Sequence, residues 1–210
     1  MPGVDFRLYL VTDRQQTLGR PLTPLVAQAL AAGVGAVQLR EKDLDSRALL
    51  SLAQDMRALT TERQVRLLIN DRIDVAMALD ADGVHLRSDS MPVSVPRRLL
   101  GPTRLIGVSA HSVAAVLDAE FQGADFAVLG PIYATPSKQP YGPPIGLHIL
   151  AEAVRRASIP IFAIGGVAAQ RVPDVQQAGA FGVAVISAIL GAEDVPAATR
   201  LLVERLAEKR

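Results

Sequence analysis

Phe126-Ala127-Val128-Leu129 are four apolar residues in a row, and Gly130-Pro131 end the run. Such a run is typical of a strand that is buried on both faces, and the Gly-Pro pair predicts an abrupt stop. The loop that follows presents Thr135, Ser137 and Lys138 between prolines. Hydroxyls and an ammonium after a buried strand suit a phosphorylated ligand. Taken alone, this loop could equally be a surface turn with a solvated lysine.

The same pattern repeats along the chain, since short runs rich in valine, leucine and isoleucine alternate with longer, alanine-rich amphipathic segments. This is a β/α rhythm. We predict eight strands near residues 7–12, 35–40, 65–70, 82–85, 103–108, 125–130, 160–164 and 181–186. We predict helices near 21–33, 45–62, 72–80, 92–100, 111–122, 146–157, 170–178 and 194–208.

Eight strands that are apolar on both faces, each followed by a helix, fit a closed parallel (β/α)8 TIM barrel better than an open sheet. An open doubly wound sheet stays possible, but its Gly-x-Gly-x-x-Gly fingerprint is missing after the first strand, where the chain reads Val11-Thr12-Asp13-Arg14. No linker or low-complexity stretch appears. We therefore predict an α/β protein with a single TIM-barrel domain over residues 1–210.

The composition narrows the function classes. The chain has 210 residues, half of them hydrophobic, which excludes intrinsic disorder. Its net charge of +1 offers no general attraction to nucleic acid or to an anionic membrane, and no cysteine is available as a nucleophile or metal ligand. No apolar stretch reaches the ~18–20 residues of a membrane span. We expect a cytoplasmic protein that binds small phosphorylated molecules locally.

In such a barrel the carboxyl ends of the strands converge on one face, so distant residues can share a site. The second strand ends in Gln38-Leu39-Arg40-Glu41-Lys42, where alternation sends Gln38, Arg40 and Lys42 to one side. Two cations and an amide can hold a diphosphate. The alternative is a charged strand exit that pairs with local acids such as Glu41 and Asp43.

Two other strand ends carry polar residues with two interpretations each. Asp71, in Asn70-Asp71-Arg72, can be a magnesium ligand, or it can cap the helix that follows, which this fragment alone favours. Ser109 supplies a hydroxyl after the fifth strand, although Ser109 or His111 could equally cap the next helix.

The last two strands end in Ile164-Gly165-Gly166 and in Val185-Ile186-Ser187. Bare glycine amides and a serine at these ends occupy the usual phosphate position of this architecture, which favours phosphate binding over the alternative of a mere tight turn. Arg40, Lys42, Asp71 and Lys138 thus suit a diphosphate with Mg²⁺, and Gly166 with Ser187 suits a single phosphate. The inferred chemistry joins two phosphorylated partners and releases diphosphate.

These motifs, in this order along nearly the whole chain, resemble those of thiamine phosphate synthases and their thiazole tautomerase relatives. The resemblance also rests on Leu8-Tyr9-Leu10-Val11-Thr12-Asp13 and Asp82-Gly83-Val84-His85-Leu86. It implies that hydroxymethylpyrimidine diphosphate and a thiazole phosphate are joined to give thiamine phosphate and diphosphate. The pyrimidine C–O bond would ionise first, and the thiazole nitrogen would capture the cation. It also hints at a homo-oligomer, a dimer or trimer.

Carried over position by position, the resemblance implies a site residue set. The pyrimidine diphosphate would contact Gln38, Leu39, Arg40, Glu41, Lys42, Asn70, Ser109 and Lys138, of which Arg40, Lys42, Ser109 and Lys138 are the expected catalytic residues. The thiazole phosphate would contact Thr135, Pro136, Ser137, Gly166, Ile186 and Ser187. Asp71 would bind Mg²⁺.

One segment departs from the synthase pattern. After Val84-His85-Leu86 the synthases usually continue Gly-Gln-x-Asp, with the aspartate as a second metal ligand, but Ser90 stands at that position here. Two possibilities are open: Asp89, one residue earlier, reaches the ion, or Arg87 replaces part of the metal's charge.

The departure leaves three functions to compare. A synthase is the favoured interpretation. A tautomerase is less favoured, because Pro131 stands where those enzymes that use a histidine carry it. A non-catalytic sensor of thiazole phosphate is the third, since a fold does not fix a function.

Overall fold

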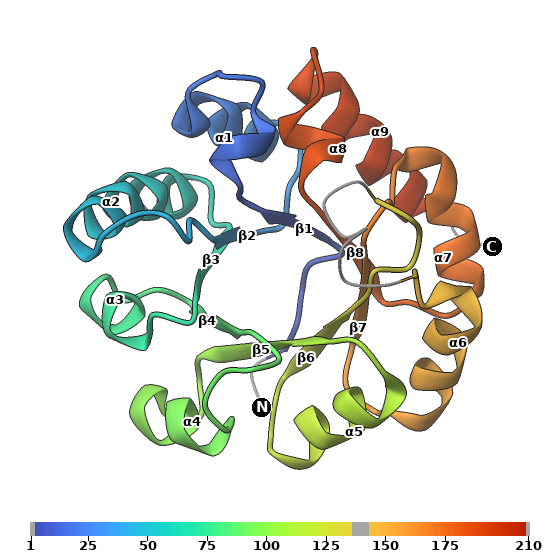
Figure 1. Ribbon diagram of the computed structural model, residues 1–210. Coiled ribbons are helices and arrows are strands. Elements are labelled where there is room, and N and C mark those ends of the chain that lie inside the picture. The colour runs from blue at the N-terminus through green and yellow to red at the C-terminus, as the bar shows by residue number, and fades with distance from the viewer. Residues whose placement is uncertain (1–2, 136–142, 209–210) are drawn as a thin grey trace.

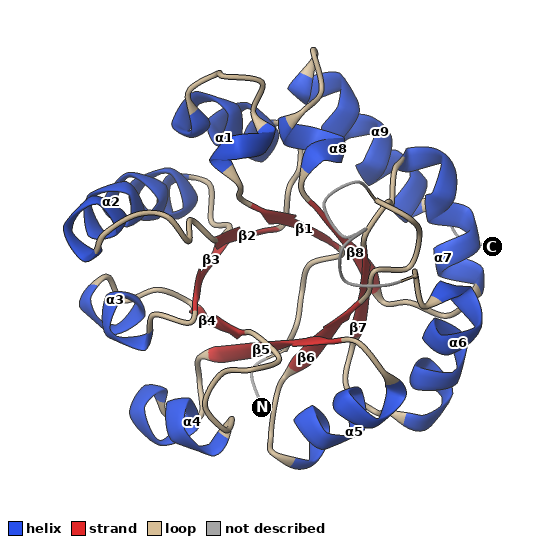
Figure 2. Ribbon diagram, viewed as in Figure 1, coloured by secondary structure: helices blue, strands red, loops and turns tan. Residues whose placement is uncertain are grey.

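The structure is a computed structural model that describes residues 3–135 and 143–208. Eight parallel strands follow one another in chain order around a closed barrel (Figures 1 and 2). They are β1 (Leu8–Val11), β2 (Ala36–Leu39), β3 (Arg66–Asn70), β4 (Gly83–Leu86), β5 (Leu105–Ala110), β6 (Phe126–Leu129), β7 (Ile161–Ile164) and β8 (Gly182–Val185). The predicted single α/β domain with a TIM barrel is confirmed.

Helices form an outer ring around the strands (Figure 2). They are α1 (Leu22–Ala31), α2 (Ser46–Glu62), α3 (Ile73–Ala78), α4 (Ser94–Leu100), α5 (Val113–Phe121), α6 (Gly146–Arg156), α7 (Val172–Gln177), α8 (Ser187–Leu190) and α9 (Val195–Ala207). Short 3-10 turns, η1 (Arg14–Gln16) and η3 (Ala169–Arg171), precede α1 and α7. Within the described residues no helix is long and apolar enough to cross a membrane.

One predicted strand needed new bounds, and one short helix was not predicted. The fifth strand, predicted over 103–108, runs from Leu105 to Ala110, because its pairing with β4 aligns Leu105 with Gly83 and leaves 102–104 in a bend. Ser109 is therefore part of the strand rather than of the loop after it. The four-residue helix α8 was not predicted, since it is too short for a periodic pattern.

The barrel interior is filled by rings rather than left open. Phe6, Phe126 and Phe162 contact one another with ring centroids 5.2–5.8 Å apart, and Tyr9 lies 5.7 Å from Phe126. Gly107 makes space for this layer, because a Cβ there would stand 2.3 Å from the Phe126 ring. The interior is thus a packed core, as in other barrels of this kind.

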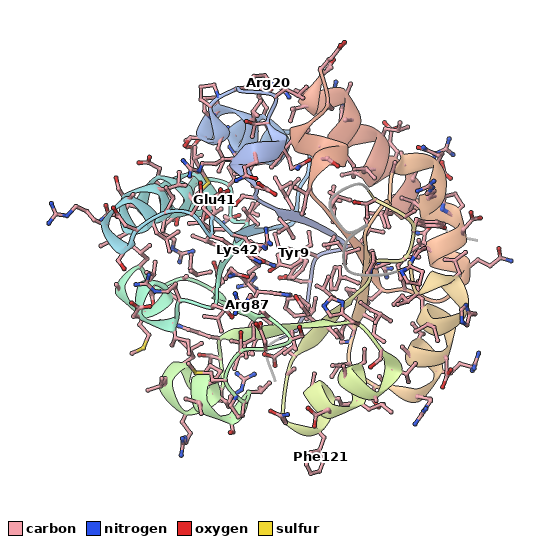
Figure 3. The ribbon with its side chains drawn as sticks, in the orientation of Figure 1. Tyr9, Arg20, Glu41, Lys42, Arg87 and Phe121 are labelled. Carbon is pink, nitrogen blue, oxygen red and sulfur yellow. The ribbon has the colours of Figure 1, made fainter. Side chains whose placement is uncertain are left out.

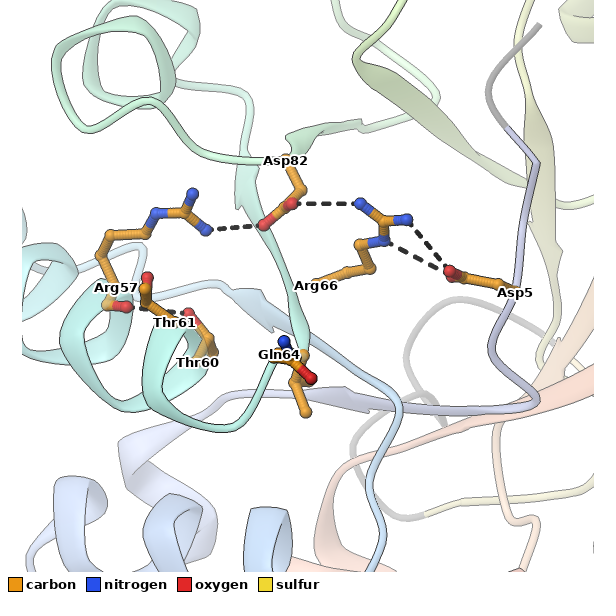
Figure 4. Close-up of a pocket in the computed structure, with 8 residues that line it drawn as sticks. Asp5, Arg57, Thr60, Thr61, Gln64, Arg66 and Asp82 are labelled. Atoms are coloured by element: carbon orange, nitrogen blue, oxygen red, sulfur yellow. Dashed lines mark hydrogen bonds and ion pairs between the residues drawn. The ribbon is translucent and has the colours of Figure 1, made fainter.

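A pocket of about 340 Å³ lies near the amino ends of β3 and β4, away from the carboxyl ends that carry the predicted site residues (Figure 4). Asp82 accepts from the Leu67 amide and pairs with Arg57 at 2.7 Å and Arg66 at 3.4 Å, and Arg66 also pairs with Asp5 at 3.0 Å. The cations here are matched by acids within the network. In TIM barrels active sites lie at the other end, at the carboxyl ends of the strands.

Gly83 gives a direct test of the packing between β4 and β5. A Cβ at this position would stand 2.0 Å from the Leu105 carbonyl oxygen, which belongs to the neighbouring strand and cannot rotate away. We expect Gly83→Ala to lower the free energy of unfolding by about 3 kcal/mol in urea titrations. Gly3→Ala is the control, because no atom lies within 4 Å of its added Cβ. Equal stability of the two variants would contradict the packing.

Candidate active site at the carboxyl ends of the strands

A chain of four polar side chains crosses the barrel from β2 to β5, just below its mouth. The amide of Gln38 donates to the Tyr9 hydroxyl at 3.2 Å, and that hydroxyl lies 3.5 Å from Nδ1 of His85. Nε2 of His85 lies 3.0 Å from the Ser109 hydroxyl. Strand alternation points all four side chains inward, so two predicted substrate contacts, Gln38 and Ser109, share one hydrogen-bonded layer.

His85 is a neutral member of this layer. Burial lowers the pKa of His85 to about 3, and the positive charge of Arg40 contributes to the same shift. Burial also raises the pKa of the Tyr9 hydroxyl. Neither side chain therefore changes its charge near neutral pH, and the layer can only orient Gln38 and Ser109.

The end of β2 divides its residues between the two faces of the barrel wall. The Arg40 amide donates to the Thr12 hydroxyl at 2.9 Å, and the Arg40 charge acts on the interior His85. Lys42 is exposed and lies toward the barrel mouth (Figure 3). Gln38 and the charge of Arg40 thus both act on the interior polar layer, and the placement of Gln38, Arg40 and Lys42 on one side around a ligand stays a prediction.

The alternate residues of this segment turn away from the mouth. Leu39 packs in the core between the strands and the helices, so its side chain does not reach a ligand. Glu41 is buried and accepts hydrogen bonds from the amide and Nε of Arg14 at 3.1 and 3.2 Å. Asp43 binds the same arginine at 2.9 Å. The local acids therefore pair with Arg14 and do not neutralise Arg40.

Asp71 follows β3 and bridges to the end of β4. Its backbone is in the left-handed region, with φ of 58°, which suits a single aspartate held by neighbours. Oδ1 accepts from the Arg87 amide at 3.2 Å and from the Ser90 hydroxyl, and Oδ2 lies 2.8 Å from Nε of Arg87. The helix-cap interpretation of Asp71 is wrong, because α3 has Arg72 at its cap position and no side-chain cap.

Asp89 pairs with the same guanidinium, since its carboxylate lies 3.0 Å from Nε and from Nη2 of Arg87. Arg87 thus contacts both of the predicted metal ligands. Carboxylate and hydroxyl oxygens are the donors Mg²⁺ prefers, and one or two carboxylates with substrate phosphate are its common ligand set. In residues 3–135 and 143–208 no group of three or more acidic or histidine side chains gathers as a metal site. Asp71 and Asp89 supply two carboxylates of the kind that fit such an ion, and Arg87 contacts both.

The remaining residues predicted to hold the diphosphate lie at the same mouth or outside the described part. Asn70 is the half-buried last residue of β3 and is aligned with His85. Lys138 lies outside the described residues. Ser109 and His111 do not cap α5, because Ser112 does so by accepting from the Ala115 amide.

Across the mouth, the loop after β6 packs onto the loop after β7. The amides of Ile132 and Tyr133 donate to the carbonyls of Ile164 and Gly165 at 2.8 and 3.0 Å. Gly165 and Gly166 have φ of 94° and 66°, and a Cβ on Gly166 would stand 2.8 Å from Tyr133. Only glycine permits this close approach.

The predicted thiazole phosphate contacts are placed in part. Thr135 is half-buried, and Gly166 lies in the β7 loop. Ile186 and the exposed Ser187 lead from β8 into α8. Pro136 and Ser137 lie outside the described residues. The loops after β7 and β8 and a short extra helix are the usual phosphate position in a TIM barrel.

Comparisons with known proteins agree with this arrangement. Residues 8–189 match the family described as thiamine monophosphate synthase. The chain belongs to that family. A thiamine-phosphate synthase of Methanoculleus marisnigri is 48% identical over 97% of each chain, and one of Roseiflexus castenholzii is 44% identical over 96% of this chain and 89% of its own.

A solved thiamine phosphate pyrophosphorylase from Pyrococcus furiosus is similar in both sequence and structure. It is 37% identical, with a TM-score of 0.87 over 96% of this chain and 95% of its own. A 3-hexulose-6-phosphate synthase, at 19% identity and a TM-score of 0.70, shares the fold alone. The predicted membership in the thiamine monophosphate synthase family is confirmed.

Sequence reasoning missed Tyr9 and the role of His85 as the centre of the polar layer. The alternation of side chains along β1 and β4 was the available signal, because it points Tyr9 and His85 into the barrel. Which neighbour each would contact depends on the barrel register, which a single sequence does not reveal.

The neutral His85 predicts how stability depends on pH. Because burial holds its pKa at about 3 in the folded protein, below the ordinary value of 6.5, protonation favours the unfolded chain. Stability from this group is therefore present above pH 6.5 and falls as the pH drops toward 3. Urea titrations should show that the wild type loses about 2 kcal/mol more than His85→Gln between pH 7 and pH 5. Equal losses would contradict a buried neutral imidazole.

Proposed function

We propose that this protein is a thiamine-phosphate synthase, a transferase that joins hydroxymethylpyrimidine diphosphate to a thiazole phosphate and releases diphosphate. The observation that carries the proposal is the convergence of Arg40, Asp71 and Ser109 at one barrel mouth that also contains the β7 and β8 loops. Cations and metal-ligating carboxylates on one side, and a phosphate loop on the other, match two phosphorylated substrates.

The residues of this chain act by stabilising the leaving group. As the pyrimidine C–O bond breaks, negative charge grows on the diphosphate, and Arg40, Lys42 and Lys138 would bind that charge more strongly than they bind the intact substrate. Gln38 and Ser109 would orient the pyrimidine from the polar layer, and Asn70 would do so from the end of β3. No protein nucleophile is required, because the thiazole nitrogen attacks the cation.

Mg²⁺ would be held by Asp71, with Asp89 as the neighbouring carboxylate. When bound, the ion would neutralise the developing charge on the diphosphate. The thiazole phosphate would lie against Gly166 and Ser187, which places the attacking ring beside the Gly130–Thr135 loop. A homo-oligomer in the cytoplasm remains the prediction from sequence.

A thiazole tautomerase is the second candidate, favoured by one observation. Nδ1 of His111 lies 2.6 Å from the Gly130 carbonyl oxygen, so a second imidazole approaches the end of β6, where Pro131 had argued against a histidine. Donation by Nδ1 leaves Nε2 as the acceptor in the neutral ring. Against this candidate, a tautomerase needs no carboxylate and cation cluster of the kind around Asp71.

The decisive assay supplies both phosphorylated substrates with Mg²⁺ and measures thiamine phosphate and diphosphate. Synthase activity predicts equal amounts of the two products. Isomerisation of the thiazole phosphate alone, without diphosphate release, would support the tautomerase instead. Binding of the thiazole phosphate without turnover of either substrate would indicate a sensor.

Asp71 is the residue whose loss should affect the reaction most specifically. Asp71→Asn removes the proposed metal charge but keeps the size, so we expect kcat to fall ~100-fold or more and the Mg²⁺ dependence to weaken. Asp118→Asn on α5 is the matched control and should keep wild-type kinetics. Full activity of Asp71→Asn with unchanged Mg²⁺ dependence would exclude Asp71 as the ligand.

Ser90→Asp tests the departure from the synthase pattern. A carboxylate beside Asp71 adds a second negative ligand for Mg²⁺, so we expect the metal concentration for half-maximal rate to fall several-fold and turnover to rise. A variant that folds but needs as much Mg²⁺ as the wild type, or more, would contradict a metal site beside position 90.

A further inference from the structure

Arg87 forms an ion pair with Asp71, the carboxylate that the proposed function assigns to magnesium. Both Asp71 oxygens are engaged by residues of the β4 loop, Oδ1 by the Arg87 amide and the Ser90 hydroxyl, and Oδ2 by the Arg87 guanidinium at 2.8 Å. The guanidinium also holds Asp89 at 3.0 Å. One cation of this chain thus neutralises two carboxylates of the proposed metal site.

A guanidinium and a magnesium ion compete for these oxygens. Both are cations that bind the same carboxylate oxygens, and a divalent ion repels a nearby guanidinium twice as strongly as a monovalent ion at the same distance. Asp71 and Arg87 are 25% and 41% exposed in their side chains, so the repulsion is only partly screened. A divalent ion therefore binds Asp71 more weakly while Arg87 is in place.

Arg87 can exchange its carboxylate partners, Asp71 and Asp89, for a phosphate group. Its Nε is buried and lies close to Asp71, yet it makes no well-aligned hydrogen bond with any described residue. Ser90 is compatible with the bridge because a hydroxyl donates to Asp71, whereas a carboxylate would add a negative charge against it. Asp89 faces Nε and Nη2 of Arg87 with its two oxygens at 3.0 Å, and an arriving diphosphate offers the guanidinium the same two-oxygen geometry with more negative charge.

We propose that Arg87 closes the metal site of the substrate-free protein and moves to the diphosphate when that substrate binds. The ion and the diphosphate then bind together. Asp71 becomes accessible to the ion only after a phosphate group has replaced Asp71 as the partner of Arg87. Arg87 is in this way a positioning residue that couples metal binding to substrate binding. The inference rests on Asp71 as the magnesium ligand.

The test measures metal binding to the protein without diphosphate, with Mn²⁺ as the probe and the spin resonance of free Mn²⁺ as the readout. We expect Arg87→Gln to bind Mn²⁺ about tenfold more tightly than the wild type, since removal of one charge near the ion is worth about that factor. The double variant Arg87→Gln with Asp71→Asn should lose the gain. Arg87→Lys, which keeps the charge, should remain close to the wild type.

Arg156→Ala is the matched control, because Arg156 pairs with Glu152 on the outer helix α6, far along the chain from the site. It should bind Mn²⁺ as the wild type does. Equal Mn²⁺ affinity of the wild type and Arg87→Gln would overturn the inference, as would a gain that survives Asp71→Asn. A gain of the same size in Arg87→Lys would also overturn it.

A second measurement uses the unaltered protein and does not depend on the folding of any variant. Millimolar Mg²⁺ alone should leave its thermal unfolding temperature unchanged, whereas Mg²⁺ with inorganic diphosphate should raise it more than diphosphate alone. Stabilisation by Mg²⁺ alone to the same extent would contradict a closed site. Product formation with both substrates is measured separately, so failure of the synthase proposal and failure of the Arg87 inference give different results.

Discussion

The pairing of β1 with β8 closes the sheet, and the rest of the site depends on that closure. Leu8, Tyr9 and Leu10 lie beside Val183, Ala184 and Val185 in register, which makes every strand an inner strand with two hydrogen-bonded neighbours. Closure fixes which side chains face inward. It also brings the carboxyl ends of eight strands to one mouth. Residues as far apart in the sequence as Gln38 and Ser187 can therefore contact ligands in the same site.

Closure creates a second constraint, because the interior must be filled. The phenylalanine layer and Tyr9 exclude water, and the same exclusion holds His85 neutral. A neutral imidazole between two hydroxyls is useful at a site that receives highly charged substrates, since it orients polar groups without adding charge. The charged side chains that the proposed mechanism uses, Arg40, Asp71 and Arg87, instead follow the carboxyl ends of β2, β3 and β4.

The fold and much of the site could be predicted from the sequence, because barrel strands carry their own local signals. Alternation placed Gln38 and Arg40 inward, and the resemblance of the strand-end motifs identified the family. The arrangement around Asp71 could not be predicted. Local pattern favoured a helix cap, but the left-handed backbone at Asp71 and the hydrogen bonds from Arg87 and Ser90 turn the carboxylate toward β4. That outcome depends on contacts between loops, which spacing in one chain does not encode.

The central claim is that the two substrates meet at this mouth, with the diphosphate on the β2–β4 side and the thiazole phosphate on the β7–β8 side. A crystal structure of the protein with Mg²⁺, diphosphate and thiamine phosphate tests it most directly. We predict diphosphate against Arg40 with the ion on Asp71, and the phosphate of thiamine phosphate at Gly166 and Ser187. Both anions on one side of the mouth, or either at the opposite end of the barrel, would contradict the claim.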